Sequence, residues 1–300
     1  LFPSLQARIA GQALPGHVRC RESPGIGRVM LIDATPIGIN VRSTVATYVG
    51  VHDELRKHFA RSEAAKQYGA KLAAEAGSKP GRHRGLTAGA FSYNTGSLRC
   101  DTCDGTGQIS LDVQFLPDVE ICCPDCRGSR YRRAAHEIRC FFDDGAAYSL
   151  PDLMAMSVDE ALTVCAGLSR VSKKLQVLHD LGLGYLTLGE QTPGLSGGEA
   201  QRLKLASEMG RGQGDSVFVF DEPTIGLHPK DVQTLMGVFA SLITKGATVV
   251  VIEHDLDVIR SADYVVDMGP GGGLAGGQVV ATGSPAQIKA CPTSFTGRFI

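Results

Sequence analysis

Two Cys-x-x-Cys pairs constrain the fold of this chain more than any other feature of its sequence. Nineteen residues, 104–122, separate the two pairs, and this spacing is typical of two knuckles that close one tetrahedral zinc site. Because all four ligands would be thiolates and no coordination position stays open, the site is predicted to be structural rather than catalytic. The predicted Zn²⁺ ligands are Cys100, Cys103, Cys123 and Cys126.

The residues between the two pairs predict a β-hairpin. Apolar and polar residues alternate over residues 109–115, which indicates a strand, and the chain is expected to fold back near Pro117-Asp118. With a glycine two residues after each pair, the pattern predicts a zinc-ribbon-like module at about 95–135. Zinc would contribute about 10–16 kcal/mol to the folding of such a module. The alternative interpretation, four ordinary buried cysteines, is disfavoured by the doubled spacing.

Four arginines follow the second cysteine pair. Guanidinium groups beside a rigid metal hairpin could contact the phosphates of nucleic acid, but a solvated charged face is an equally open interpretation. The chain has 30 basic and 31 acidic side chains and a formal net charge of −1, so binding to nucleic acid must come from a local patch. The candidate contacts are Arg127, Arg130, Arg132 and Arg133, with Lys79, Arg82 and Arg84 of a basic linker as the alternative.

A glycine-rich helix start after residue 195 predicts an anion site. Two glycines and a serine at a helix N-terminus direct backbone N–H groups, a hydroxyl and the positive end of the helix dipole toward one point. Taken alone this pattern is weak evidence, because most glycine-rich helix starts are only turns. The candidate ligand-binding residues are Ser196, Gly197, Gly198 and Gln201.

Two predicted strands in the last third of the chain end in groups suited to nucleotide chemistry. The apolar strand at residues 216–220 is followed by Asp221 and Glu222, and the strand at 247–252 is followed two residues later by His254. Asp221 can hold Mg²⁺, Glu222 can orient or deprotonate an attacking water, and His254 can hydrogen-bond a γ-phosphate. An amphipathic helix over 230–245 connects the two strands, and this strand-helix-strand order implies a parallel sheet.

These motifs together resemble those of one family. The segments LSGGEAQRLKLA, VFVFDEPTIGLHPKD and VVVIEHDLDVIRSADYVVDMGPGGG resemble the signature, Walker B and switch-histidine motifs of ABC-type ATPases. The histidine in GLH, the inserted cysteine module, FLPDV, IDATPIG and GSRY narrow the resemblance to the UvrA family, the damage-recognition subunits of UvrABC excinucleases. The resemblance covers nearly the whole chain and corresponds to the C-terminal half of such a protein.

The resemblance implies a function and a set of partners. It implies ATP- and Mg²⁺-dependent recognition of damaged double-stranded DNA in nucleotide excision repair. It further implies homodimerisation, transfer of DNA to a UvrB-like protein, and readout of duplex distortion rather than base sequence. No hydrophobic run approaches the roughly 20 residues that span a bilayer, so we expect a soluble, cytoplasmic protein without membrane contact.

The expected fold is α/β: an ABC-ATPase-type parallel-sheet nucleotide-binding core, with an inserted helical signature domain that carries the zinc module. The predicted core comprises residues 1–47 and 213–300, and the predicted signature domain comprises 48–212. The chain starts at Leu1 within a helix-like stretch, so we expect it to be a fragment.

Two departures from the family pattern bear on the enzymatic reaction. No Gly-x-x-x-x-Gly-Lys-Ser/Thr motif occurs in the 300 residues, so the isolated chain is expected to be inactive as an ATPase. Relatives carry glutamine at the position of Ala34, and the chain therefore lacks a side chain expected to sense Mg²⁺ and the attacking water. Two alternative functions stay open: a UvrA-like drug self-resistance protein acting on DNA, and a catalytically dead, zinc-stabilised module that binds DNA or a partner.

Overall fold

The computed structural model describes residues 1–16, 18, 25–38, 40–75, 85–111, 119–209, 214–227, 229–269, 271 and 276–300. The chain divides into two compact units, which are described separately: unit 1 comprises Leu1–Asp33 and Gln213–Ile300, and unit 2 comprises Ala34–Gly212. The domain boundaries expected from the sequence stay a prediction. The basic linker residues, the fold-back at Pro117-Asp118 and the histidine of the GLH motif, His228, lie outside the described residues.

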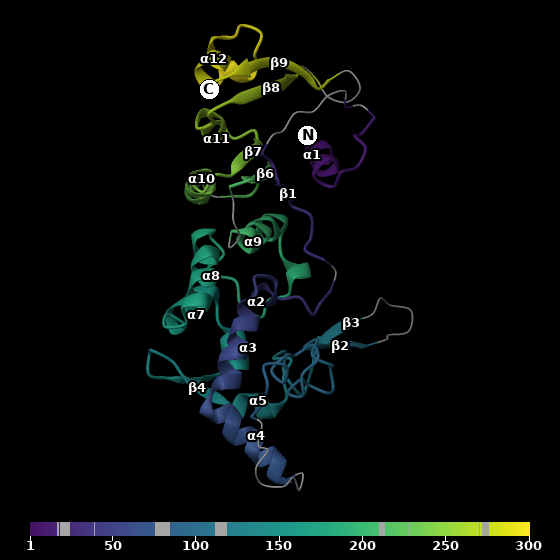
Figure 1. Ribbon diagram of the computed structural model, residues 1–300, viewed down its shortest axis with the longest axis vertical. Helices are drawn as coiled ribbons and strands as arrows, with labels where there is room; N and C mark the ends of the chain where they lie inside the picture. Colours follow the sequence, from purple (N-terminus) through teal and green to yellow (C-terminus); the bar gives the residue numbers. More distant parts are fainter. Residues whose placement is uncertain are drawn as a thin grey trace. The chain divides into compact units, whose positions relative to one another are not determined.

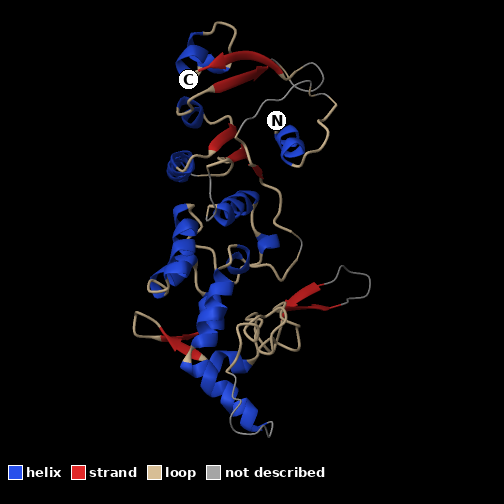
Figure 2. Ribbon diagram, viewed as in Figure 1, coloured by secondary structure: helices blue, strands red, loops and turns tan. Residues whose placement is uncertain are grey.

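Unit 1 is built on a short parallel sheet (Figures 1 and 2). Strand β6 lies between β1 and β7 and pairs in parallel with both. Its elements are α1 (Phe2–Ile9), β1 (Arg28–Ile32), β6 (Ser216–Asp221), α10 (Pro229–Thr244), β7 (Thr248–Ile252), α11 (Leu256–Arg260), β8 (Val265–Gly269), β9 (Gln278–Gly283), α12 (Pro285–Ala290) and η3 (Thr296–Arg298). The strand-helix-strand order predicted for residues 216–252 is confirmed.

Helices cover both faces of strand β6. Because side chains alternate between the faces of a strand, Val217 and Val219 lie on one face and cluster with Leu5 of α1. On the other face, the Phe220 ring lies 4.7 Å from the ring of Phe239 in α10. Residues 216–220 are all buried, and burial ends at Asp221, so the strand delivers its terminal carboxylate to the surface.

Strands β8 and β9 do not extend the parallel sheet. They form a separate antiparallel pair with an irregularity between Asp267 and Met268. Only residues 270–277 connect them, whereas a parallel connection needs a crossover of about a dozen residues or more. The strand-helix-strand pattern expected for the last third of the chain therefore holds for β6 and β7 but not for its end.

Unit 2 is mainly helical and carries two small antiparallel hairpins, β2–β3 and β4–β5 (Figure 2). Its elements are α2 (Val45–Tyr48), α3 (Val51–Arg61), α4 (Glu63–Glu75), β2 (Gln108–Leu111), β3 (Val119–Cys122), α5 (Arg133–Glu137), β4 (Arg139–Phe141), β5 (Ala147–Ser149), α6 (Leu150–Ala155), α7 (Val158–Val164), α8 (Ser169–Asp180), η1 (Thr192–Gly194) and α9 (Gly197–Glu208).

Serine caps divide the helical part of unit 2 into short segments. Ser62 adopts an extended conformation between α3 and α4, and its hydroxyl accepts a hydrogen bond from the N–H of Ala65. Ser149 and Ser157 begin α6 and α7 with capping boxes, in which serine and the residue three positions later satisfy each other's backbone N–H groups. None of the helices within the described ranges combines the length and hydropathy that a bilayer span requires.

Candidate functional site

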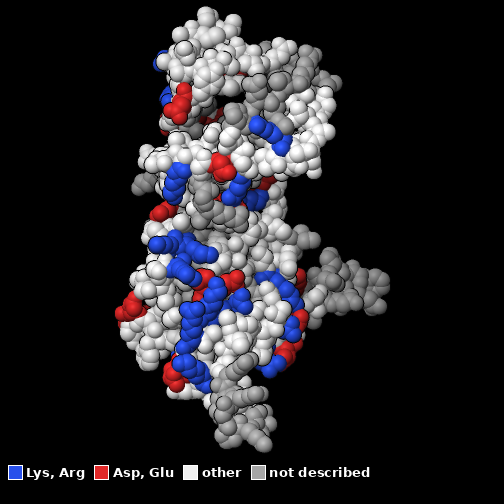
Figure 3. All heavy atoms as spheres, in the orientation of Figure 1, with Lys and Arg blue, Asp and Glu red and all other residues white. Residues whose placement is uncertain are grey.

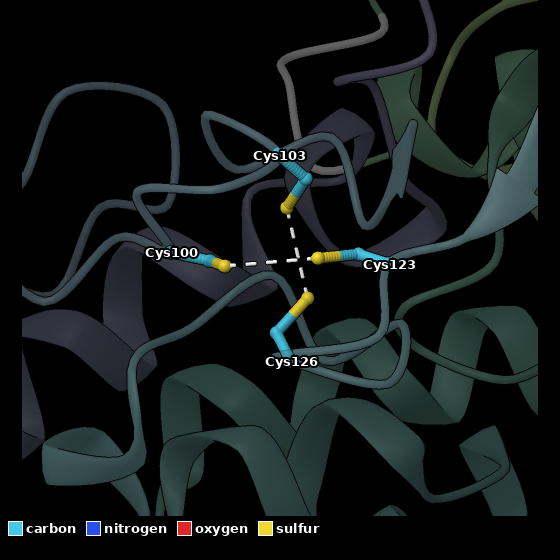
Figure 4. Close-up of side chains that lie close together, drawn as sticks. All are labelled: Cys100, Cys103, Cys123 and Cys126. Carbon is cyan, nitrogen blue, oxygen red and sulfur yellow. Dashed lines mark hydrogen bonds between the residues drawn. The ribbon is translucent and has the colours of Figure 1, made fainter. Parts of the chain in front are cut away.

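The two cysteine pairs converge at one point in unit 2. Figure 4 shows the four sulfur atoms directed toward a common centre, and all four lie within 4.8 Å of one another. The Cys100 and Cys123 sulfurs are 3.9 Å apart, and those of Cys103 and Cys126 are 3.6 Å apart. A zinc–sulfur distance of about 2.3 Å gives a tetrahedron with edges of about 3.8 Å, so the buried thiols fit a tetrahedral zinc ion.

The backbone around the knuckles is packed tightly. Gly105 has φ +77, and a Cβ atom there would lie 1.8 Å from the carbonyl oxygen of Tyr93. The N–H of Gly107 donates to the Cys103 sulfur at 3.3 Å. The predicted hairpin is confirmed, because β2 and β3 pair antiparallel, with Gln108 opposite Cys122. Only glycine therefore fits at position 105, because both the conformation and the close approach exclude a side chain.

The environment of the thiols differs from one cysteine to the next. Burial raises the pKa of Cys103, but the hydrogen bond from Gly107 and the neighbouring thiols outweigh it and lower the pKa to about 7. Burial raises the pKa of Cys100 and of Cys126 above the ordinary value. The Cys103 thiol is thus close to its ionisation point at neutral pH, and metal binding requires the deprotonated form of all four thiols.

The four candidate arginines lie in different environments. Arg127 and Arg133 are exposed, and Arg132 pairs with Asp101 at the surface. Arg130 is only 4% exposed, and its guanidinium donates to the carbonyl oxygen of Val41 at 3.0 Å. Arg130 is therefore buried inside the protein, whereas the other three arginines are exposed to solvent. In Figure 3 the Lys and Arg side chains on the visible face are interspersed with Asp and Glu side chains.

A buried polar cluster beside the knuckles was missed by the sequence analysis. His52 of α3 is 3% exposed, and its Nε2 lies 2.8 Å from the Tyr131 hydroxyl, which donates to the carbonyl oxygen of Phe91. Burial, together with nearby Arg56, lowers the pKa of His52 from 6.5 to about 3. The neutral form of His52 is therefore part of the fold, and no local sequence signal marks it, because its partner is 79 residues away.

The signature segment opens helix α9 as predicted. Ser196 is the N-cap, and its hydroxyl accepts from the N–H of Glu199, while the Glu199 carboxylate accepts from the N–H of Ser196. Gly197 follows at a close approach, because a Cβ there would lie 3.1 Å from the Cβ of Ala34. Gly198 occupies the next position in the helix. Gln201 is only 4% exposed, so its side chain is buried, unlike Ser196 and Gly197 at the exposed helix start.

Tyr185 was not singled out from the sequence, but it supports the same helix start. Its hydroxyl donates to the Glu199 carboxylate. Burial and this hydrogen bond raise the pKa of Tyr185 to about 12. Glu199 therefore accepts hydrogen bonds from two directions, and its pKa is lowered even though burial opposes the change.

The candidate catalytic residues meet at the carboxyl ends of β6 and β7 in unit 1. Asp221 is the last residue of β6 and pairs in register with Ile252. Glu222 follows with φ +46, and its N–H donates to the carbonyl oxygen of Ile252. Its carboxylate lies 3.3 Å from Nε2 of His254, whose side chain is 85% exposed. The parallel pairing thus brings Glu222 and His254 together at one sheet edge, where ligands bind in α/β proteins.

Glu253 holds this edge in shape, although the sequence analysis gave it no role. One of its carboxylate oxygens accepts from the N–H of Thr224, and the other accepts from the N–H groups of His254 and Asp255. The carboxylate therefore ties the turn after β6 to the turn after β7. In the sequence, the role of Glu253 could be suspected only from its position directly before His254, at the end of a predicted strand.

The chain is similar to known proteins over its full length. No family model matches the chain. The chain is 42% identical to UvrABC system protein A of Streptomyces avermitilis over 303 aligned residues, which cover 100% of the chain and 28% of that protein. It is 42% identical to UvrABC system protein A of Bacillus subtilis, over 96% of the chain and 28% of that protein.

A solved structure matches the fold. The crystal structure of UvrA2 from Deinococcus radiodurans superimposes with a TM-score of 0.79 and 39% sequence identity, covering 92% of the chain and 31% of that protein. Both comparisons therefore point to one segment of the same kind of protein. Over its whole length the chain is thus similar to one segment of UvrA proteins, and it spans 28% of the length of the curated relatives named above.

Proposed function

We propose that this chain is the part of a UvrA protein that combines half of an ATPase site with a zinc-stabilised DNA-binding module. In this proposal the intact protein uses ATP to recognise damaged double-stranded DNA in nucleotide excision repair. The observation that carries the proposal is the identity of 42% with proteins named UvrABC system protein A, which extends over the full chain. The geometry at the ends of β6 and β7 supports the ATPase part.

In the intact protein, Asp221 holds Mg²⁺, whose charge would stabilise the phosphates of bound ATP. Glu222 orients the attacking water and accepts its proton, and His254 hydrogen-bonds the γ-phosphate. The 3.3 Å distance between Glu222 and His254 supports a shared task. Ser196, Gly197 and Gly198 complete a nucleotide site against a P-loop, which this sequence does not contain.

The four-cysteine centre binds Zn²⁺ as a structural ion. Its four buried thiols leave no open coordination position, so zinc supplies folding free energy rather than chemistry. The exposed guanidiniums of Arg127, Arg132 and Arg133 contact DNA phosphates and carry no base information. The relatives' printed name, UvrABC system protein A, supports a UvrB-like partner as a further part of the proposal. The proposal also includes the homodimer that the resemblance of the sequence implies.

The carboxylate of Glu222 gives the sharpest test. In the protein that contains this chain, Glu222→Gln keeps the shape of the side chain but removes its ability to accept a proton. We expect ATP binding to persist while steady-state turnover falls about 10²–10⁴-fold. Asp257→Asn is the matched control, because Asp257 is an exposed carboxylate of the same unit with 83% of its side chain accessible. Equal turnover in the Glu222 variant and the control would contradict the proposed role.

The isolated 300-residue chain tests the other half of the proposal. We expect no measurable ATP hydrolysis above the Glu222→Gln background, because no phosphate-binding lysine loop is present in the sequence. Zinc-loaded chain should still bind duplex DNA, measured by fluorescence anisotropy, and should prefer a distorted duplex over an intact one of the same sequence. No binding to either duplex would contradict the DNA-binding role.

A further inference from the structure

Residues 34–44 of unit 2 form a linking segment, of which residue 39 lies outside the described residues. One end of the segment contacts the signature helix α9. Lys204 of α9 donates to the Thr35 hydroxyl at 2.7 Å. Ala34 lies so close to Gly197 that a Cβ added to Gly197 would be 3.3 Å from the Ala34 carbonyl oxygen. The first two residues of the segment are therefore packed against α9 and bonded to it.

The other end of the linking segment is held by the cysteine knuckles. Arg42 donates to the backbone carbonyl of Asp104 and pairs with its carboxylate at 2.7 Å. Asp104 directly follows the ligand Cys103 and has φ +52. Arg130 donates to the carbonyl oxygen of Val41 at 3.0 Å. Asp104, beside the first knuckle, therefore holds Arg42, and Arg130, beside the second knuckle, holds Val41.

The middle of the linking segment is tied to the residues that precede α9. The N–H of Thr192 donates to the carbonyl oxygen of Ser43 at 3.0 Å, and the Thr192 hydroxyl donates to that of Ile37 at 3.2 Å. Thr192 is 1% exposed, so these bonds lie away from water. Thr44 continues the connection, because its hydroxyl lies 3.0 Å from that of Tyr93, seven residues before the first knuckle. The segment is therefore bonded at both ends and in between.

Arg130 makes this connection sensitive to the metal. Its backbone carbonyl accepts from the N–H of Cys100 in the first knuckle, and Arg130 itself follows Cys126 of the second knuckle by four residues. Among the described residues, no carboxylate pairs with its buried guanidinium, which lies 5.1 Å from the centre of the Tyr93 ring. A zinc ion bound by four thiolates carries excess negative charge. That charge would compensate the buried guanidinium, since an unpaired buried charge is strongly unfavourable.

We propose that the linking segment couples the metal centre to the signature helix, with Arg42 and Arg130 as positioning residues. Zinc in the knuckles fixes the positions of Asp104 and Arg130, which hold Arg42 and Val41 of the segment. Through its further hydrogen bonds, the segment in turn fixes the start of α9. Because coupling between two sites is reciprocal, rearrangement of α9 would in turn loosen the knuckles. This inference rests on the proposed zinc site and adds a regulatory connection to it.

Hydrogen exchange of the full 300-residue chain, with zinc content measured first, tests the coupling. The informative amides are those of Thr192, Val45 and Ala46, which bond to Ser43, Glu190 and Leu188. We expect zinc removal by a chelator to accelerate their exchange at least about fivefold. The amide of Cys165, which bonds within α7, is the internal reference and should stay protected.

A pair of variants separates the linking segment from simple loss of a surface ion pair. Arg42 and Arg99 both pair with the Asp104 carboxylate at 2.7 Å, but only Arg42 belongs to the segment. We expect Arg42→Ala, with zinc still bound, to accelerate exchange at Thr192 about fivefold, and Arg99→Ala to change it less than about twofold. The variants need no metal removal, so they remain informative even if the apo chain is poorly folded.

Each outcome decides the question. Chain without zinc contradicts the proposed metal site itself. Zinc-loaded chain in which neither chelation nor Arg42→Ala alters exchange at Thr192, Val45 and Ala46 overturns the coupling but leaves the metal site intact. Equal effects of the two arginine variants, or simultaneous loss of protection at Cys165, also overturn it, because the change would then be general loosening rather than transmission along the segment.

Discussion

The four-cysteine centre and the carboxylate edge of β6 differ in how completely the chain encloses them. All four cysteine residues are at most 8% exposed, and one stretch of unit 2 provides them. At the β6 edge, by contrast, the side chains of Glu222 and His254 are 40% and 85% exposed. A structural metal site must exclude water and competing ligands, whereas a site for a substrate must stay open until the substrate arrives. The four-cysteine centre therefore maintains the fold, whereas the edge of β6 is held open to a substrate.

Loss of one thiol should have the largest effect, because it removes the enclosed site. In Cys103→Ser we expect bound zinc to fall from about one ion per chain to near zero, since four thiolates are needed to close the tetrahedron. The module should lose much of the about 10–16 kcal/mol that such ions contribute, while unit 1 stays folded. Elemental analysis and limited proteolysis measure these two effects.

Cys122→Ser is the matched control for the zinc experiment. Cys122 directly precedes a ligand but is exposed, and it is not one of the four gathered thiols. The control should retain zinc and resist proteolysis as the unmodified chain does. Similar zinc loss in both variants would show that the enclosed site is not formed by Cys100, Cys103, Cys123 and Cys126 alone.

The pH dependence of unit 2 should be the next largest effect. His52 has a pKa of about 3 in the folded chain and 6.5 when unfolded, so between these values only the unfolded chain binds the proton. Stability is therefore fully present above pH 6.5 and falls as the pH drops toward 3, by up to about 1.4 kcal/mol per pH unit from this group. Urea unfolding at pH 7 and pH 5 measures it. In His52→Gln the difference between the two pH values should shrink; an unchanged difference assigns it to other groups.

The sequence predicts part of the structure of both sites, the enclosed four-cysteine centre and the open edge of β6. The cysteine pairs, the β2–β3 hairpin and the strands that deliver Asp221 and Glu222 are encoded locally, so spacing and alternation suffice. The contact of Arg130 with Val41 joins residues 89 positions apart, and no local pattern reports such a contact. The four arginines are similar in sequence context, and only tertiary packing distinguishes the buried one from the rest.

Two glycines with the same backbone conformation measure how tightly the enclosed region is packed. Gly105 and Gly145 have φ +77 and +78, but only at Gly105 would a Cβ meet another atom within 4 Å. Alanine should cost about 1–2 kcal/mol of stability at Gly145, from the conformation alone. At Gly105 it should cost about 1–3 kcal/mol more, from the clash with Tyr93. Urea midpoints that coincide for the two variants would argue against tight packing at the knuckle.

The smallest expected effect concerns the exposed arginines of the module. Replacement of Arg127, Arg132 and Arg133 by alanine should reduce the slope of log affinity for DNA against log salt by about 0.9 for each phosphate that the variant no longer neutralises. The reduction should be the same for all duplex sequences, because phosphates carry no base information. A triple variant of exposed arginines elsewhere in unit 2 has the same change of charge: Arg61, Arg139 and Arg170. If both triple variants lower the slope equally, the arginines act only through net charge.

The backbone of Glu222 has a consequence for how this protein can change over generations. At φ +46 any residue other than glycine pays a conformational penalty, of about 1–2 kcal/mol for the left-handed region. Glycine at 222 would relieve that strain and delete the carboxylate. Selection for thermal robustness alone would therefore favour the loss of this side chain, and only a demand for its chemistry would retain it. Persistence of the glutamate in a lineage would record continued use of the site.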